Sequence, residues 1–228
     1  MKSIYLLVLA CFSFAVSGIL AVPVPGKNMK IYKEGEQTKE HGDKIKTLKE
    51  TEADAHFGIN QALRVANFPE NQENESIMVK AFNKDFHPHV DLIRQTLKAM
   101  YKGKLMVRKV NDNSDAMKGR PARVRSSNKE ASFGPSFYDL GNRQRAFGFT
   151  HEVSHAMANT KDCFAKADGR PLSTEESKHI DHFIGYQQND HASLQSQSSV
   201  QNADSYAILA ELAVDQYWAH KEHPPKKK

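Results

Sequence analysis

The chain has 228 residues, of which 26% are charged, and its formal net charge is +5. A chain this rich in charge is not a polytopic membrane protein, and about 200 residues suit one domain with a full-sized core. The basic excess is modest and interleaved with acids, so the composition does not predict a nucleic-acid-binding protein.

The N-terminus has the pattern of a secretory signal peptide over residues 1–21. Lys2 supplies the positive charge, and the apolar stretch from Ile4 to Val16 is too short to span a bilayer. The sequence therefore predicts a secreted, extracellular protein with no membrane partner. Residues 22–50 are polar and predicted to form a flexible leader or pro-segment, ahead of a domain over residues 51–222. Residues 223–228 are predicted to be a solvated basic tail.

Cysteine usage is sparse for a secreted chain. Cys11 would leave with the signal peptide, and Cys163 would then be the only cysteine of the mature protein. No intrachain disulfide is expected, so Cys163 is either buried or able to pair between chains. A monomer is the default expectation.

Helices are predicted first along the chain. Residues 52–66 carry apolar side chains at helical spacing, and residues 76–86 are expected to form a second helix. Pro88 suits the first turn of a third helix, which Gly103 would end. Short strands are predicted over residues 104–110, 122–125 and 131–133, with a turn at residues 111–115 between the first two.

The second half of the chain is predicted to be mainly helical. The expected helices cover residues 143–158, a segment from the capping-box run at Ser173 to about His191, and a last segment from Asn202 or Asp204 to about His220. Helices first, then a small sheet, then helices again predict an α+β, predominantly helical domain.

The most informative motif is His-Glu-x-x-His, formed by His151, Glu152 and His155. On a helix, positions i and i+4 share one face, so both imidazoles can bind one metal ion, while the glutamate can take a proton from a metal-bound water. Two histidines need a third ligand. The metzincin pattern fails, because Ala158 and Lys161 stand where it needs Gly and His.

Several acids remain as the third ligand. Glu175 and Glu176 have the thermolysin-like spacing but also suit the first turn of a helix. Aspartate is the other choice, offered by Asp162, Asp168 and Asp181.

The chain resembles the deuterolysin-like, or aspzincin, metalloendopeptidases, which include fungal peptidyl-Lys endopeptidases. These carry His-Glu-x-x-His, then Gly-Thr-x-Asp-x-x-Tyr-Gly, and later a run close to Asn-Ala-Asp-Ser-Tyr. This chain has His-Glu-x-x-His at residues 151–155 and Asn-Ala-Asp-Ser-Tyr at residues 202–206. The resemblance implies a zincin-like domain with His151 and His155 as zinc ligands and Glu152 as the general base.

The resemblance leaves two alignments for the ligand Asp. Asp181 is preferred, because Gly185 and the offset to Asn202 follow the family pattern. Asp162 is the alternative, within Asn-Thr-Lys-Asp at residues 159–162. Both alignments lose the family's Tyr, for which Tyr186 would substitute as a donor to the oxyanion. Asp204 is expected to bind substrate.

The resulting hypothesis is a secreted zinc metalloendopeptidase that hydrolyses protein or peptide substrates through a zinc-activated water and a Glu general base. The missing Tyr and the absent family cysteines keep a second hypothesis open, a secreted binding or effector protein on the same scaffold.

Overall fold

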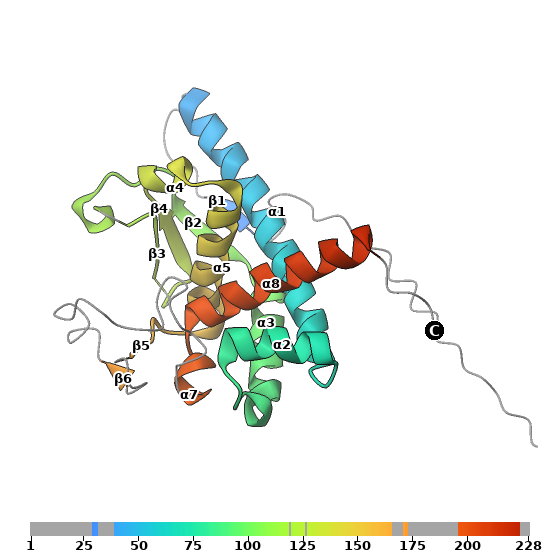
Figure 1. Cartoon of the computed structure of the whole chain (residues 1–228). Coiled ribbons are helices and arrows are strands. Elements are labelled where there is room, and N and C mark those ends of the chain that lie inside the picture. Colours follow the sequence, from blue (N-terminus) through green and yellow to red (C-terminus); the bar gives the residue numbers. More distant parts are fainter. Residues whose placement is uncertain are drawn as a thin grey trace, which may run out of the picture.

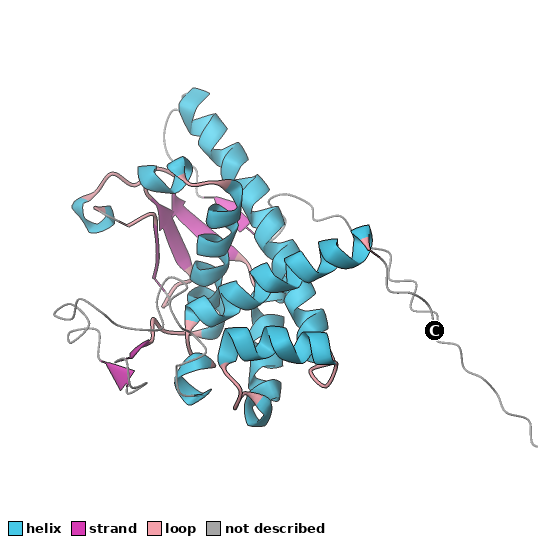
Figure 2. Ribbon diagram, viewed as in Figure 1, coloured by secondary structure: helices cyan, strands magenta, loops and turns pink. Residues whose placement is uncertain are grey.

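The computed structural model describes residues 29–31, 39–118, 120–125, 127–165, 171–172 and 196–223. The predicted signal peptide (1–21), the whole of the predicted helix from Ser173 to His191, and residues 224–228 of the basic tail lie outside these residues. The described part is mostly helical with a small mixed sheet (Figures 1 and 2), which confirms an α+β, predominantly helical fold. Among the described helices, none combines the length and the apolar character needed to cross a bilayer.

Four helices form the main packing unit. Helix α1 (Lys39–Asn67) packs against α3 (Val90–Lys102), α5 (Asn142–Ala158) and α8 (Ala203–Glu222), and α5 packs against α8. Helix α2 (Gln72–Phe82) covers α8 and leads through the short helix η1 (His87–His89) into α3. Figure 1 shows α8 crossing α1, while α5 stands between α8 and the sheet.

Helix α1 is longer than predicted and includes residues expected to belong to a flexible leader. Residues 39–50 form its first turns, where the side chain of Leu48 is fully buried. The strand β1 (Met29–Ile31) pairs with the sheet. In its described residues the predicted leader is therefore part of the domain, because it supplies both a strand and a core side chain.

The sheet has the strand order β1-β2-β4-β3, with β2 at Leu105–Lys109, β3 at Ala122–Arg125 and β4 at Glu130–Phe133. Strand β2 is parallel to β1 and β4, and β3 is antiparallel to β4. The predicted strands are confirmed, but β2 and β3 are not neighbours. Strand β4 lies between β2 and β3. Its Ala131 and Phe133 are fully buried, as suits an inner strand, whereas Arg123 and Arg125 of β3 are exposed, as suits an edge strand.

Short elements connect these layers. The predicted turn after β2 is confirmed by Asp112, whose carboxylate accepts the backbone N–H of Ser114. The remaining short elements are η2 (Asp115–Met117), α4 (Pro135–Asp139), β5 (Phe164–Ala165), β6 (Pro171–Leu172) and α7 (Ser196–Ser199).

Candidate metal centre

Helix α5 carries both histidines of the motif and holds them between the sheet and α8. Phe149 is buried and stacks on Phe133 of β4, with ring centroids 5.8 Å apart. The side chains of His151 and His155 are only 13% and 14% exposed, and their rings meet edge to face. The packing of α5 therefore fixes the two imidazoles on one face, as the i, i+4 spacing requires.

The chain reverses immediately after α5. Asn159 ends the helix with φ 55° and ψ 36°, a left-handed conformation that glycine and asparagine adopt most readily. The hydroxyl groups of Ser154 and Thr160 lie 2.7 Å apart, which ties the turn to the helix. This reversal brings Asp162 back over the two histidines.

The returning segment is held by the start of α8. The backbone N–H of Lys161 donates to the carbonyl of Gln201 at 2.8 Å, and its carbonyl accepts the N–H of Ala203 at 2.9 Å. The side chain of Asn202, which is fully buried, accepts the N–H of Cys163 at 3.2 Å. Three hydrogen bonds on both sides of Asp162 therefore fix its position relative to α5.

The three side chains of His151, His155 and Asp162 form a compact triangle of donor atoms. The two Nε2 atoms are 3.0 Å apart, and the Asp162 Oδ1 atom lies 3.1 Å from that of His151 and 3.2 Å from that of His155. Donor atoms of a tetrahedral zinc site lie about 3.3 Å apart, given bonds of about 2.0–2.1 Å. The spacing matches that of a metal site closely, and this group could hold a metal ion.

Hydrogen bonds on the far side of each ring fix the tautomers. The Nδ1–H of His151 donates to Asp204 Oδ1 at 2.5 Å, and that of His155 donates to the carbonyl of Thr160 at 2.8 Å. Because a carboxylate and a carbonyl oxygen only accept, each Nδ1 keeps its proton and each Nε2 atom is left to face the Asp162 carboxylate. A charged ring donates from Nε2 to that carboxylate, and a neutral ring can instead offer its Nε2 lone pair to a cation placed between the three groups.

The titration behaviour of the triangle agrees with this geometry. Burial alone would lower the pKa of His151, but hydrogen bonds to Asp162 and Asp204 outweigh it and raise that pKa to about 10. Burial likewise opposes ionisation of Asp162, yet the hydrogen bonds from both histidines hold its pKa well below its usual range. The surroundings therefore stabilise a positive charge at the centre, which a proton or a metal ion can supply.

Glu152 lies beside the triangle and faces the edge of the sheet. Its side chain is 9% exposed, and burial raises its pKa, although the nearby histidines oppose that shift. The nearby backbone of Val124 in β3 also favours the ionised form of this carboxylate. Glu152 is thus positioned between the face of α5 that carries His151 and His155 and the edge strand.

The other predicted site residues have different placements. Asp181 and Tyr186 lie outside the described residues, as do Asp168, Glu175 and Glu176. Among the aspartates considered, Asp162 is the described one that the fold brings to the two histidines.

The structure gives Asp204 a different position from the one expected for substrate binding. This residue is 2% exposed and contacts the far side of the His151 ring. A buried carboxylate behind a histidine orients that ring rather than touching a substrate.

The sequence reasoning missed Thr160 and Asn202. Thr160 accepts from His155 through its carbonyl, and Asn202 holds the segment that carries Asp162. Both lie in runs that carry the aspzincin resemblance, and the order of residues in those runs was the available signal.

No protein-family model matches this chain, and no curated protein matches it.

Proposed function

We propose that the chain is a secreted zinc metalloendopeptidase with a zincin-like domain. The observation that carries the proposal is the convergence of His151, His155 and Asp162 beside Glu152. Two imidazole nitrogens and one carboxylate oxygen form a ligand set that suits catalytic zinc, which keeps a further position open. Asp162 is 42% exposed, so the triangle is accessible from its side.

The turn after α5 supports the kinship with aspzincins. Asn159 adopts a left-handed conformation at the position where that family has glycine. Thr160 and Asp162 follow in the family's order, and Asn202 and Asp204 bind the metal-binding segment and His151. The two runs that carry the resemblance thus have complementary roles in one site, which favours Asp162 over Asp181 as the third ligand.

Zinc held by this triangle would polarise a substrate carbonyl and lower the pKa of a coordinated water. Glu152 lies one residue after His151 and is the group able to take a proton from the attacking water. It then passes this proton to the leaving amine, so no covalent intermediate with the protein is needed. Asp204 holds the His151 ring in the tautomer that leaves Nε2 free to bind the metal.

An extended peptide is the substrate that fits the surroundings best. Strand β3 is at the edge of the sheet and packs against α5, and its Val124 contacts Glu152 through the backbone. An edge strand offers unpaired backbone groups to which an extended segment can add. A peptide bound in this way would run past the carboxylate of Glu152.

The test is digestion of a peptide mixture by the secreted, purified protein, with the products identified by mass spectrometry. Four samples are compared: wild type, Glu152→Gln, Asp162→Ala, and wild type treated with a chelator. We expect cleavage by wild type with added zinc, and a loss of at least about a hundredfold in the other three. The cut sites would give the specificity.

A matched control is Asp215→Ala, which removes an exposed carboxylate from α8 without touching the triangle. Its cleavage rate should equal that of wild type. A folded wild type that binds one zinc but cleaves nothing would overturn the peptidase and leave a secreted binding or effector protein. Cleavage that survives both Glu152→Gln and chelation would exclude this site as its source.

A further inference from the structure

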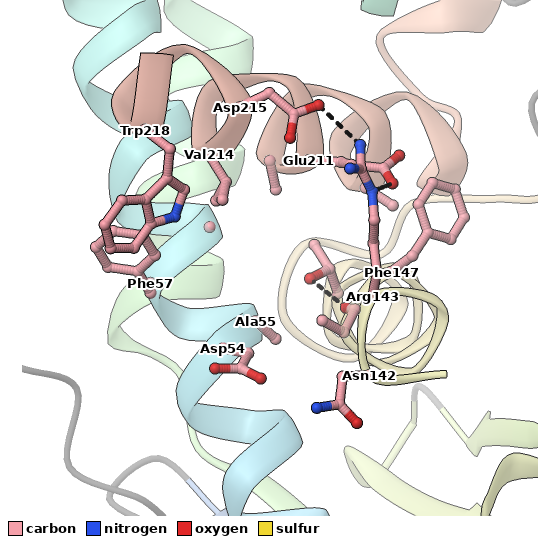
Figure 3. A pocket seen from close by; sticks show the side chains of 15 residues that line it. Asp54, Ala55, Phe57, Asn142, Arg143, Phe147, Glu211, Val214, Asp215 and Trp218 are labelled. Atoms are coloured by element: carbon pink, nitrogen blue, oxygen red, sulfur yellow. Dashed lines mark hydrogen bonds and ion pairs between the residues drawn. The ribbon is translucent and has the colours of Figure 1, made fainter. Parts of the chain in front are cut away.

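A cavity lies between α1, α5 and α8, away from the triangle of His151, His155 and Asp162. Its volume is about 390 Å³, within the range of about 300–1,000 Å³ typical of ligand pockets. Figure 3 shows side chains from three helices around it, with Phe57 and Trp218 on one side and Arg143 and Phe147 on the other. On α5, the lining residues occupy a different face from His151 and His155.

The cavity exists because small residues face one another where the helices meet. A methyl group added at Gly58 would stand 3.3 Å from the Cβ atom of Ala210, so α1 and α8 approach closely at that point. Beside this contact, short side chains leave a volume that no neighbour fills. They are Ala55, Ala146, Ala207 and Ala210.

The charged groups around the cavity are predominantly acidic. Arg143 forms ion pairs with Glu211 and with Asp215, the latter at 2.7 Å. Asp54 is the third acid of the lining; it is exposed to solvent, and among the described residues its carboxylate has no side-chain hydrogen bond or salt bridge. The lining therefore holds three acids and one arginine, in a protein whose net charge is +5.

The surroundings of Asp54 disfavour its negative charge. Burial raises the pKa of this carboxyl, repulsion by Glu50 adds to the shift, and Arg145 offsets it only in part. A cation bound beside Asp54 would offset the repulsion by Glu50 and favour the ionised carboxylate. In Figure 3 the Asp54 carboxylate stands at one end of the cavity, near the side chain of Asn142.

The aromatic side of the cavity suits the body of such a ligand. The ring centroids of Phe57 and Trp218 are 6.5 Å apart, and the Trp218 side chain is 46% exposed although it lines a cavity. An apolar body could rest on these rings and on the short side chains of the floor. One cation already lies over the Trp218 ring, because Lys221 Nζ is 4.7 Å from its centroid, so the ligand's charge is directed to Asp54. The acid and the aromatic rings belong to one continuous space.

We propose that this cavity binds a small organic cation, a primary amine or guanidinium on an apolar or aromatic body. The cationic group would pair with Asp54, and the body would fill the space between Phe57, Trp218 and the alanine floor. The proposal does not depend on peptidase activity, because none of the metal-binding residues lines the cavity.

The chain has one tryptophan, Trp218, so its fluorescence reports directly on this cavity. The experiment titrates the zinc-loaded full chain with 2-phenylethylamine, and with 2-phenylethanol and 3-phenylpropionate as matched neutral and acidic probes. We expect a saturable change in Trp218 emission with the amine, binding about two- to fivefold weaker for the neutral probe, and weaker still for the acidic one.

Two variants locate the binding. Asp54→Asn keeps the shape and removes the charge, and should weaken the amine about two- to fivefold while leaving 2-phenylethanol unchanged. Ala146→Leu fills the cavity and should abolish the response to all probes. Zinc content and thermal melting of both variants show whether they remain folded. Equal binding of the three probes, no saturable response, or an amine affinity unaffected by either variant would overturn the proposal.

Discussion

The triangle of His151, His155 and Asp162 and the cavity involve different faces of helix α5 and are built in opposite ways. At the triangle, each histidine has a hydrogen-bond acceptor behind it, and the segment carrying Asp162 is held by backbone pairing to α8. At the cavity, short side chains leave space and Asp54 has no salt bridge among the described residues. The first arrangement fixes three donor atoms close together, whereas the second leaves an open space lined by small side chains.

The largest effect is expected at the triangle. Asp162→Ala should reduce zinc affinity by more than about a hundredfold, because loss of a direct ligand exceeds the loss of an outer one. Competition with a chromophoric chelator measures this change. Asp215→Ala on the cavity side should leave zinc affinity unchanged, and an equal loss in both variants would erase the distinction between the two faces.

A smaller effect is expected behind the triangle. Asp204→Asn keeps the volume of a buried side chain but removes the charge that orients His151. Zinc affinity should fall about tenfold to a hundredfold. The same chelator competition checks this, and circular dichroism should show an unchanged fold. An unaltered affinity would mean that the contact does not orient the ring.

The backbone of α5 offers a test of stability rather than of binding. A methyl group at Gly148 would meet no atom within 4 Å, so Gly148→Ala should raise the free energy of unfolding by about 1 kcal/mol. Gly103→Ala is the contrasting control. Its Cβ would stand 2.2 Å from the Sδ atom of Met157 and 2.9 Å from the carbonyl oxygen of Ala99, so it should destabilise the protein. Denaturant unfolding measures both.

The smallest effect is a pH dependence of opposite sign at two aspartates. Asp54 has a raised pKa in the folded state, from burial first and then Glu50, so its ionisation opposes folding. Asp54→Asn should therefore stabilise the protein slightly near neutral pH, and this gain should vanish as the pH falls below the carboxyl range.

At Asp112, burial alone would raise the pKa, but hydrogen bonds from Ser114 and Lys109 lower it. Asp112→Asn should therefore destabilise the protein near neutral pH, and the loss should shrink as the pH falls through the folded-state pKa of the carboxyl. Unfolding curves across acidic and neutral pH check both signs. Parallel pH profiles for the two variants would contradict the assignment.

Much of the local structure was predictable because it depends on neighbours along the chain. The apolar spacing at Ile59, Leu63 and Ala66 predicts a helix, and the i, i+4 spacing of His151 and His155 predicts one shared face. The structure confirms both. The structure also places the start of α1 earlier than predicted, at Lys39. Leu48 is buried there by a tertiary contact, which the polar sequence around it does not indicate.

The tertiary structure decided the sheet order and the partners of the histidines. Strand β4 pairs with β2 because its buried residues need the inner position, which periodicity within β4 does not reveal. Asp162 reaches the histidines only because Asn159 reverses the chain and Lys161 pairs with the start of α8. Asp204 lies behind His151 for the same reason. The sequence determined which groups could bind a metal, and long-range backbone pairing decided which of them meet.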